Sequence, residues 1–237
     1  MRVGIAGCGL IGGSLALALR AAHDVRAYDP AGTGEIPSVG RVEDLLQGDV
    51  VVVATPLSQV VPTLRALASQ SDGAVLMDVG SLKRDVAAFA ATAPATARIV
   101  GGHPMAGTTE QGYAAARADL FAGRPFFLVP TARSDERSLQ VAGDLARAAG
   151  AVPTVVSAAE HDRIAAVLSG LPLLVARALA RVGADLVDLA GPGFRDATRL
   201  AKTPPELADA LLKGNASEVR AALAKLRTAL DEAERAL

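Results

Sequence analysis

Residues 101–107, Gly-Gly-His-Pro-Met-Ala-Gly, contain the side chain of this sequence that is best suited to acid–base chemistry. A histidine with an ordinary pKa of about 6.5 is largely neutral at the pH of a cell, so His103 could accept a proton there. Pro104 fixes its own φ angle and favours an extended backbone at His103. Residues 98–100 predict a short buried strand, which places His103 at the carboxyl end, where open α/β sheets bind ligands. The alternative is a loop histidine without a role.

A second buried strand is predicted over residues 74–77, and residues 78–83, Asp-Val-Gly-Ser-Leu-Lys, follow it. Ser81 and Lys83 therefore lie after the carboxyl end of a strand and are candidates to face the same crevice as His103. A serine there would orient the imidazole or a substrate hydroxyl. Each residue also has a structural alternative, because Ser81 could be a helix N-cap and Lys83 a solvated residue of a first helical turn.

Three cations, Arg195, Arg199 and Lys202, fall within eight residues in the second half of the chain. Their spacings of four and three residues would place all three on one face of a helix. Such a face suits an anionic substrate, and Arg199 could hold a carboxylate through the two-pronged hydrogen bonding of a guanidinium. A solvated helix face is the alternative interpretation.

The amino-terminal residues predict a dinucleotide-binding turn. A short strand over residues 2–6 leads into residues 7–12, Gly-Cys-Gly-Leu-Ile-Gly, and then into an Ala/Leu-rich helix over residues 14–20. In such a turn the first glycine permits the sharp bend, the second lets the backbone approach a pyrophosphate, and the third lets the helix pack on the strand. The residues predicted to bind the cofactor here are Gly7, Gly9, Leu10, Ile11 and Gly12.

The second predicted strand, residues 25–28, ends in Asp29 at the spacing that the dinucleotide fingerprint requires. A carboxylate at this position accepts hydrogen bonds from ribose hydroxyls and repels a 2′-phosphate, and no arginine directly follows it, so we expect NAD in preference to NADP. Thr55 and Pro56 end a valine-rich strand over residues 49–54 and are also predicted to contact the cofactor. Cys8 is interpreted as a small residue that fills the turn.

Composition bounds the class of protein. The 237 residues carry a formal net charge of −1, which argues against a nucleic-acid or acidic-membrane partner bound by bulk electrostatics. We expect no apolar run to reach the roughly 18 residues that span a bilayer. The first residues enter a strand directly, so we expect no secretory leader, and the single cysteine excludes an intrachain disulfide. These features predict a soluble cytoplasmic protein.

The pattern of elements changes near residue 156. Up to there we predict a Rossmann-type, doubly wound parallel sheet, with further strands over 125–130 and 152–156 and helices over 60–67, 112–120 and 138–149. Residues 157–237 predict only helices, over 158–168, 171–190, 204–212 and 216–237. Because these helices have broad apolar faces, we expect residues 1–156 to bind the cofactor and residues 157–237 to form a homodimer.

Several segments resemble the prephenate and arogenate dehydrogenases of tyrosine biosynthesis, namely residues 7–14, 78–83, 102–107, 112–113 with 119–121, and 193–199. The resemblance implies an NAD-binding Rossmann domain, a helical domain that builds a dimer, and oxidative decarboxylation of prephenate to 4-hydroxyphenylpyruvate. It supports His103 and Ser81 as catalytic residues and Arg199, Lys202 and Arg195 as substrate-binding residues.

Two departures from the family pattern leave alternatives open. Residues 169–173 are Ser-Gly-Leu-Pro-Leu where many bacterial members have Ser-His-Leu-Pro-His, so an arogenate or dual-specificity cyclohexadienyl dehydrogenase stays possible. Residues 30–41, Pro/Gly-rich, are shorter than the usual helix-bearing segment. A β-hydroxyacid dehydrogenase would rely on Lys202 and leave residues 101–107 unexplained. A non-catalytic NAD-binding regulator would not need His103, Ser81 and Arg199 together.

Overall fold

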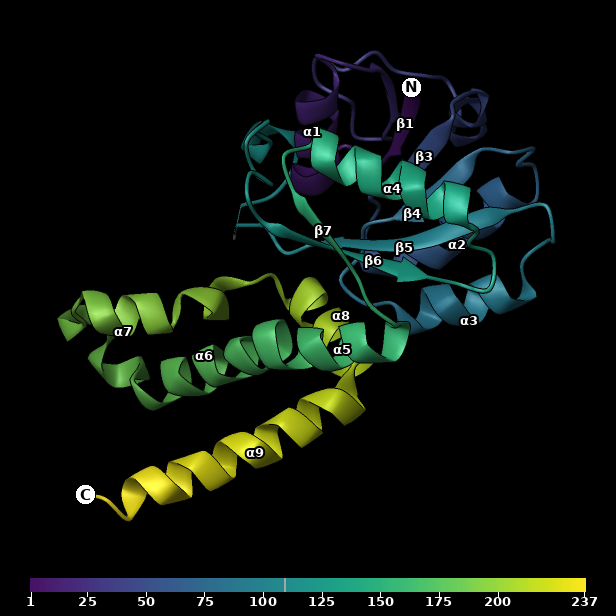
Figure 1. The fold of residues 1–237 in the computed structure, drawn as a ribbon. Helices are drawn as coiled ribbons and strands as arrows, with labels where there is room; N and C mark the ends of the chain where they lie inside the picture. Colours follow the sequence, from purple (N-terminus) through teal and green to yellow (C-terminus); the bar gives the residue numbers. More distant parts are fainter. Residues whose placement is uncertain (109) are drawn as a thin grey trace. The chain divides into compact units, whose positions relative to one another are not determined.

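A seven-stranded sheet forms the centre of the first part of the chain in the computed structural model, which describes residues 1–108 and 110–237 (Figure 1). The strand order is β2-β1-β3-β4-β5-β6-β7, and the strands are β1 (Arg2–Ala6), β2 (Asp24–Tyr28), β3 (Val50–Val53), β4 (Val75–Asp78), β5 (Arg98–Pro104), β6 (Pro125–Pro130) and β7 (Val152–Val155). The chain turns back between β1 and β3, and this switch point is where open α/β sheets bind ligands. All four valines of β3 are buried, as expected of a central parallel strand.

The first five strands are parallel, but β6 is antiparallel to β5 and β7 is parallel to β6. The helix expected over residues 112–120 does not form, since only the 3-10 turn η2 (Tyr113–Ala115) lies there. Leu120 and Phe121 are buried in the core instead of lining a helix. Because no crossover helix joins β5 to β6, the chain re-enters the sheet in the opposite direction.

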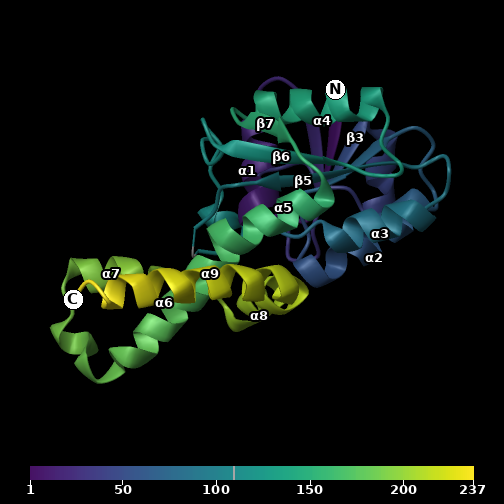
Figure 2. The same cartoon turned by 60° about the horizontal axis from the view of Figure 1, so that its bottom comes forward.

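Helices cover both faces of this sheet (Figure 2). On one face α1 (Leu10–Leu19) and α4 (Glu136–Ala148) bury Leu15 and Leu145. On the other face lie the helices α2 (Leu57–Ala68) and α3 (Arg84–Thr92), together with the 3-10 helix η1 (Val42–Gln47). This arrangement confirms the predicted Rossmann-type sheet.

The chain divides into two compact units, Met1–His161 and Asp162–Leu237. Helix α5 (Ala158–Ala165) runs across this division, and the domain boundary predicted between residues 156 and 157 stays a prediction. Elements after α5 are the π-helical turn η3 (Ala166–Gly170), α6 (Leu171–Val182), η4 (Ala184–Leu189), α7 (Pro192–Ala197), η5 (Arg199–Lys202), α8 (Pro205–Gly214) and α9 (Ala216–Glu234). The helix expected over residues 171–190 is interrupted, because Gly183 ends α6 and a 3-10 helix follows.

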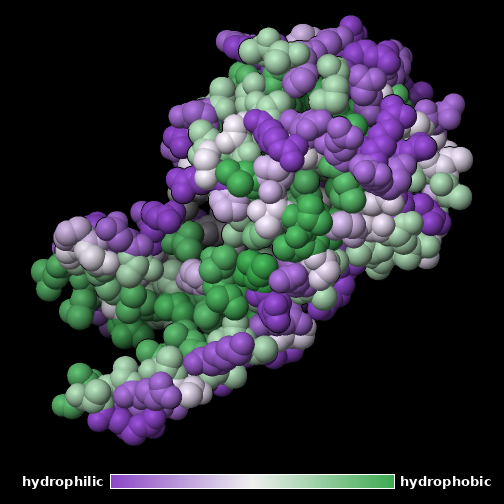
Figure 3. Space-filling model, viewed as in Figure 1, coloured by the Kyte–Doolittle hydropathy of each residue, from purple (hydrophilic) through white to green (hydrophobic). Residues whose placement is uncertain are grey.

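One helix of the described residues, Ala158–Val182, is long and apolar enough to cross a membrane by length and composition alone. The expectation that no segment reaches this length was wrong, because α5, η3 and α6 join into one helix. Apolar side chains gather over this region in Figure 3. Val182 and Leu189 are each 84% exposed, and Leu186 is 63% exposed, so the helical unit presents apolar surface.

Candidate active site

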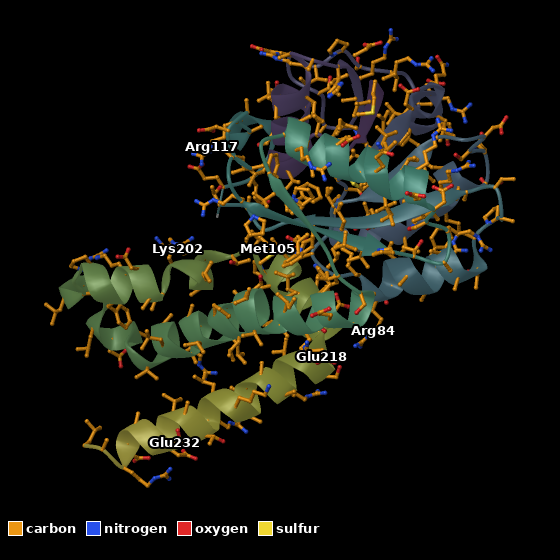
Figure 4. The ribbon with its side chains drawn as sticks, in the orientation of Figure 1. Arg84, Met105, Arg117, Lys202, Glu218 and Glu232 are labelled. Carbon is orange, nitrogen blue, oxygen red and sulfur yellow. The ribbon has the colours of Figure 1, made fainter. Side chains whose placement is uncertain are left out.

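His103 lies within strand β5, where it pairs with Phe127 of β6. The strand was expected to end before the histidine. It continues through Pro104 because these residues pair with the antiparallel neighbour β6. The side chain is only 8% exposed. Met105, labelled in Figure 4, follows directly after the strand. The candidate base is therefore held by a sheet strand and not by a loop.

A second histidine contacts the first. The Nδ1 atom of His103 lies 2.9 Å from the Nε2 atom of His161, and the two rings meet edge to face with their centroids 5.1 Å apart. His161 lies on α5 and is fully buried, with the ring of Phe127 5.6 Å away on another side. This contact engages Nδ1 of His103, so Nε2 is the ring nitrogen that does not contact His161.

A buried ion pair lies at the carboxyl end of β4. The Lys83 ammonium donates a hydrogen bond to Oδ2 of Asp78, and both side chains are almost completely buried. The Gly80 N–H donates to the same oxygen over 2.9 Å. A side chain at Gly101 would collide with this pair, since a Cβ there would lie 2.9 Å from Cδ of Lys83. A Cβ at Gly102 would lie 2.6 Å from the backbone carbonyl oxygen of Asp78. Gly101 therefore makes room for the Lys83 side chain, and Gly102 allows the close approach of the two strands.

Electrostatics at this site favour a neutral imidazole. Burial lowers the pKa of His103 well below its ordinary value of 6.5, and the nearby His161 and Lys83 lower it further. Burial raises the pKa of Asp78, while the Lys83 ammonium and the Gly80 N–H oppose that shift. A histidine that stays unprotonated near pH 7 is able to accept a proton there.

Replacing Lys83 with methionine is expected to lower the free energy of unfolding by about 3–5 kcal/mol at pH 7, because it leaves the Asp78 carboxylate buried without its cation. Chemical denaturation measures this loss. A buried carboxylate has a raised pKa and takes up a proton as the pH falls, so the loss should be smaller at pH 5 than at pH 8. The double variant Lys83→Met/Asp78→Leu is the control and should recover much of the stability. A loss of under about 1 kcal/mol in the single variant, the size of an exposed pair, would contradict this account.

Ser81 lies in the loop between β4 and α3 and is half-buried. It is not the N-cap of α3, because Lys83 occupies that position. The solvated alternative for Lys83 is also wrong, since its side chain is 1% exposed. Strand β4 is the parallel neighbour of β5, with Asp78 opposite Gly101, so Ser81 after β4 and His103 near the end of β5 both lie beyond this pair toward the same edge of the sheet.

The glycine-rich turn has the backbone that nucleotide binding requires. Gly7 has a φ angle of 94°, and a Cβ there would lie 2.6 Å from the carbonyl oxygen of Ala54. A Cβ at Gly12 would lie 1.9 Å from the carbonyl oxygen of Gly7, so the helix could not pack as it does. Nothing described lies within 4 Å of a Cβ built at Gly9, which leaves open space beside the backbone where a pyrophosphate would approach.

The first turn of α1, which includes Leu10 and Ile11, contains no acidic residue, and no described side chain caps Gly9. The exposed backbone N–H groups and the helix dipole at this end therefore favour an anionic group. Burial, followed by the charge of Asp29, raises the pKa of the Cys8 thiol to about 11. A thiol with such a pKa is a poor nucleophile at neutral pH, which agrees with a filling role.

Asp29 directly follows β2, beside this turn. Its Oδ2 accepts the Cys8 N–H over 2.6 Å, and its Oδ1 accepts the Ala31 N–H over 2.8 Å. These two bonds hold the carboxylate at the carboxyl edge of the sheet. Thr55 follows β3 against Gly7, and its hydroxyl is buried without a hydrogen-bond partner in the described structure. Pro56 is the exposed N-cap of α2.

The three predicted substrate-binding cations lie in the second unit and are exposed. They do not share one α-helical face, because α7 ends before Thr198 and the chain continues as the 3-10 helix η5. Arg195 belongs to α7 and donates through Nε to the carbonyl oxygen of Ala190 over 3.0 Å. Arg199 and Lys202 belong to η5, and Lys202 is labelled in Figure 4.

The sequence analysis did not predict two features of this site: the presence of His161 and the burial of Lys83. His161 was not singled out, although it is one of only three histidines, because its contact with His103 spans 58 residues. The adjacent polar residues Glu160, His161 and Asp162 in an apolar helix were the available signal. Lys83 was considered, with a solvated position as the alternative, but its burial depends on Asp78 and on Gly101 of the neighbouring strand.

The sheet, its switch point and the glycine-rich turn define a nucleotide-binding protein of the Rossmann class. Residues 31–155 match the family model described as "Prephenate dehydrogenase, nucleotide-binding domain", and residues 157–237 match "Prephenate dehydrogenase, dimerization domain". The chain belongs to the prephenate dehydrogenase family. The predicted fold class, a Rossmann-type domain followed by a helical dimerisation domain, is confirmed.

Similar proteins include enzymes with different substrates. The prephenate dehydrogenase of Bacillus subtilis (strain 168) is 31% identical over 240 residues, and the match covers 91% of this chain but 64% of that protein. The structure of prephenate dehydrogenase from A. aeolicus in complex with hydroxyphenyl propionate and NAD+ has a TM-score of 0.88 at 27% identity, and covers 99% of this chain and 90% of that one. Synechocystis arogenate dehydrogenase has a TM-score of 0.83 at 29% identity, with 98% and 90% coverage. The family therefore includes dehydrogenases named for prephenate and for arogenate.

Proposed function

We propose that this protein is an NAD-dependent prephenate dehydrogenase, which converts prephenate to 4-hydroxyphenylpyruvate and CO2. The observation that carries the proposal is the buried histidine of β5, whose lowered pKa makes it a neutral base in a chain of this family. Support for NAD as the cofactor comes from the nucleotide-binding family model and from the NAD+ complex of the A. aeolicus relative.

The residues of the turn fit a dinucleotide. Gly9 leaves open space beside the helix N-terminus for the pyrophosphate, and Asp29 presents a fixed carboxylate to a ribose. Gly7, Leu10, Ile11 and Gly12 would form the rest of this cradle, with Thr55 and Pro56 at the end of the neighbouring strand. When bound, NAD accepts the hydride that leaves the substrate ring.

The protein must position prephenate and remove a proton. In this proposal Nε2 of His103 accepts the proton of the hydroxyl at ring carbon C4, and Ser81 orients the imidazole or that hydroxyl. Loss of the hydride from C4 and of CO2 from C1 makes the ring aromatic. Arg199 binds a substrate carboxylate through its guanidinium, with Arg195 and Lys202 adding positive charge.

An activity assay tests the proposal. The purified protein is mixed with NAD and either prephenate or arogenate, and absorbance at about 340 nm follows the formation of the reduced nicotinamide. Faster turnover of prephenate supports it. Faster turnover of arogenate, or equal turnover of both, would make the protein an arogenate or cyclohexadienyl dehydrogenase. Gly170 and Leu173 leave the choice of substrate open, because many bacterial members of the family have histidines at these two positions. Binding of NAD without turnover of either substrate would indicate a non-catalytic regulator.

We expect kcat/KM to be higher with NAD than with NADP. The Asp29 carboxylate would repel a 2′-phosphate, while it accepts hydrogen bonds from the ribose hydroxyls of NAD. Steady-state kinetics with the two cofactors measures the ratio of the two kcat/KM values, and Asp29→Ser should bring this ratio closer to one. Asp24, an exposed aspartate at the other end of β2, provides the control Asp24→Ser, which should leave the ratio unchanged. Equal values for the wild-type protein would contradict the prediction.

We further propose a homodimer formed mainly by residues 157–237, because that segment matches a dimerisation domain and presents Val182, Leu186 and Leu189 to solvent. Light scattering should give a mass near twice the 24.0 kDa chain. Leu189→Asp should increase the monomer fraction, whereas Val152→Asp on the exposed edge strand β7 should not. A stable, active monomer would refute the proposal. A soluble cytoplasmic protein without a nucleic-acid or membrane partner stays a prediction.

A further inference from the structure

The hydrogen bond between His103 and His161 joins two imidazoles that are both enclosed by protein. His161 is fully buried on α5, and His103 keeps 8% exposure on β5. The 2.9 Å distance between Nδ1 of His103 and Nε2 of His161 is that of an ordinary hydrogen bond. The ring of Phe127 contacts His161 edge to face, so the second imidazole is fixed from two sides.

A hydrogen bond between two neutral imidazoles has only two arrangements. In one, His103 donates from Nδ1 and His161 accepts at Nε2, which leaves Nε2 of His103 with a free lone pair. In the other, His161 donates, and a neutral His103 then carries its proton on Nε2. Only the first arrangement leaves a free lone pair on Nε2, the nitrogen of His103 that does not contact His161. The buried cation of Lys83 disfavours a positive charge on the His103 ring.

We propose that His161 is a positioning residue that accepts the Nδ1 proton of His103 and so fixes the tautomer and the ring orientation needed for proton abstraction at Nε2. This inference rests on the proposed function, since it assigns a role in the same proton transfer. When Nε2 takes the substrate proton, His103 becomes an imidazolium whose Nδ1–H still donates to His161. The proton on Nε2 then passes to solvent, which restores the neutral base.

This role differs from a purely structural one. A partner that holds the second nitrogen of a catalytic histidine sets which nitrogen carries the proton. A merely structural histidine would contribute to stability without selecting a tautomer. The tautomer of His103 is therefore the observation that separates the two roles.

Nitrogen-15 NMR of the histidine rings reads the tautomer directly, and the chain has only three histidines. His103→Asn and His23→Gln spectra assign the signals by their disappearance. At pH 8 we expect His103 to carry its proton on Nδ1 and a bare lone pair on Nε2. A wild-type His103 with its proton on Nε2 would overturn the proposal, and this readout needs no turnover.

Two variants test the consequence for catalysis. His161→Phe keeps an aromatic ring beside Phe127 but removes the acceptor, so kcat should fall by about 10- to 100-fold, which is less than the loss expected when the base itself is removed. His161→Gln offers an amide oxygen as acceptor and should restore at least part of the turnover. Affinity for NAD should not change in either variant. His23→Gln, which removes a histidine next to the chain's N-terminus, is the matched control and should turn over normally.

The outcomes separate this inference from the proposed function. If the phenylalanine variant folds and turns over normally, or if the glutamine variant is no better than phenylalanine, His161 does not position the base. If the phenylalanine variant does not fold, the tautomer of wild-type His103 and the turnover of His161→Gln still test whether His161 positions the base. If wild-type protein oxidises neither prephenate nor arogenate while His103 carries its proton on Nδ1, the function fails and the pairing stands.

Discussion

Turnover of the His103→Asn variant is expected to fall by a factor of about 10²–10⁴, the usual contribution of a positioned acid–base group. Asparagine keeps a similar size and some hydrogen bonding, but it cannot take up a proton at neutral pH. Affinity for NAD should hardly change, because the proposed base meets the substrate and not the pyrophosphate. Turnover, NAD affinity and melting temperature measured on one preparation separate this result from misfolding.

The pH profile gives a second test of the same residue. The pKa of His103 is lowered well below 6.5, and only the neutral imidazole can act as a base. The kcat/KM of the wild-type protein should therefore stay level near neutral pH and fall only as the pH drops through that lowered pKa. The asparagine variant should lack this acid limb. Near-normal turnover in a stable variant would end the base hypothesis.

Arg199→Ala is expected to raise KM for prephenate by about 30- to 1000-fold, which corresponds to the roughly 2–4 kcal/mol of a charge-assisted pair with a carboxylate. NAD affinity should change far less, because this arginine is proposed to bind substrate. Arg199→Lys keeps the charge but loses the planar guanidinium, so its KM for prephenate should lie between those of the wild-type protein and Arg199→Ala.

Arg227, an exposed arginine of α9, offers a matched control. Arg227→Ala removes the same charge from the helical unit and should leave KM unchanged. If Arg199→Ala weakens NAD and prephenate equally, or lowers the melting temperature in proportion to the loss of activity, Arg199 supports the fold and does not bind substrate.

Local chemistry made part of this protein predictable from its sequence. Gly7 adopts a φ angle of 94°, which only glycine tolerates readily, so the glycine spacing after β1 indicated the turn before any packing was known. The continuous valines of β3 indicated a strand buried on both faces. In each case the signal depends on a few consecutive residues, whose own backbone and burial preferences determine the local structure.

Resemblance to a known family also came from local segments, and it predicted the fold class and the paired domains that the family models match. The roles of Ser81, Arg199 and the other site residues stay predictions, because they concern ligands. The helix expected over residues 112–120 does not form, because here the local pattern did not determine the structure. Leu120 at its end and Phe121 directly after it are buried in the core of the sheet instead, through contacts with distant segments.

Only the tertiary structure decided how the base is held. His103 lies in a strand because β6 pairs with β5 in the antiparallel direction, and its Nδ1 meets a histidine 58 residues further along the chain. Lys83 is buried because Gly101 of the neighbouring strand leaves space for its side chain, which pairs with Asp78. Neither contact has a local signal, since the energy of a buried polar group depends on partners that distant segments bring to it.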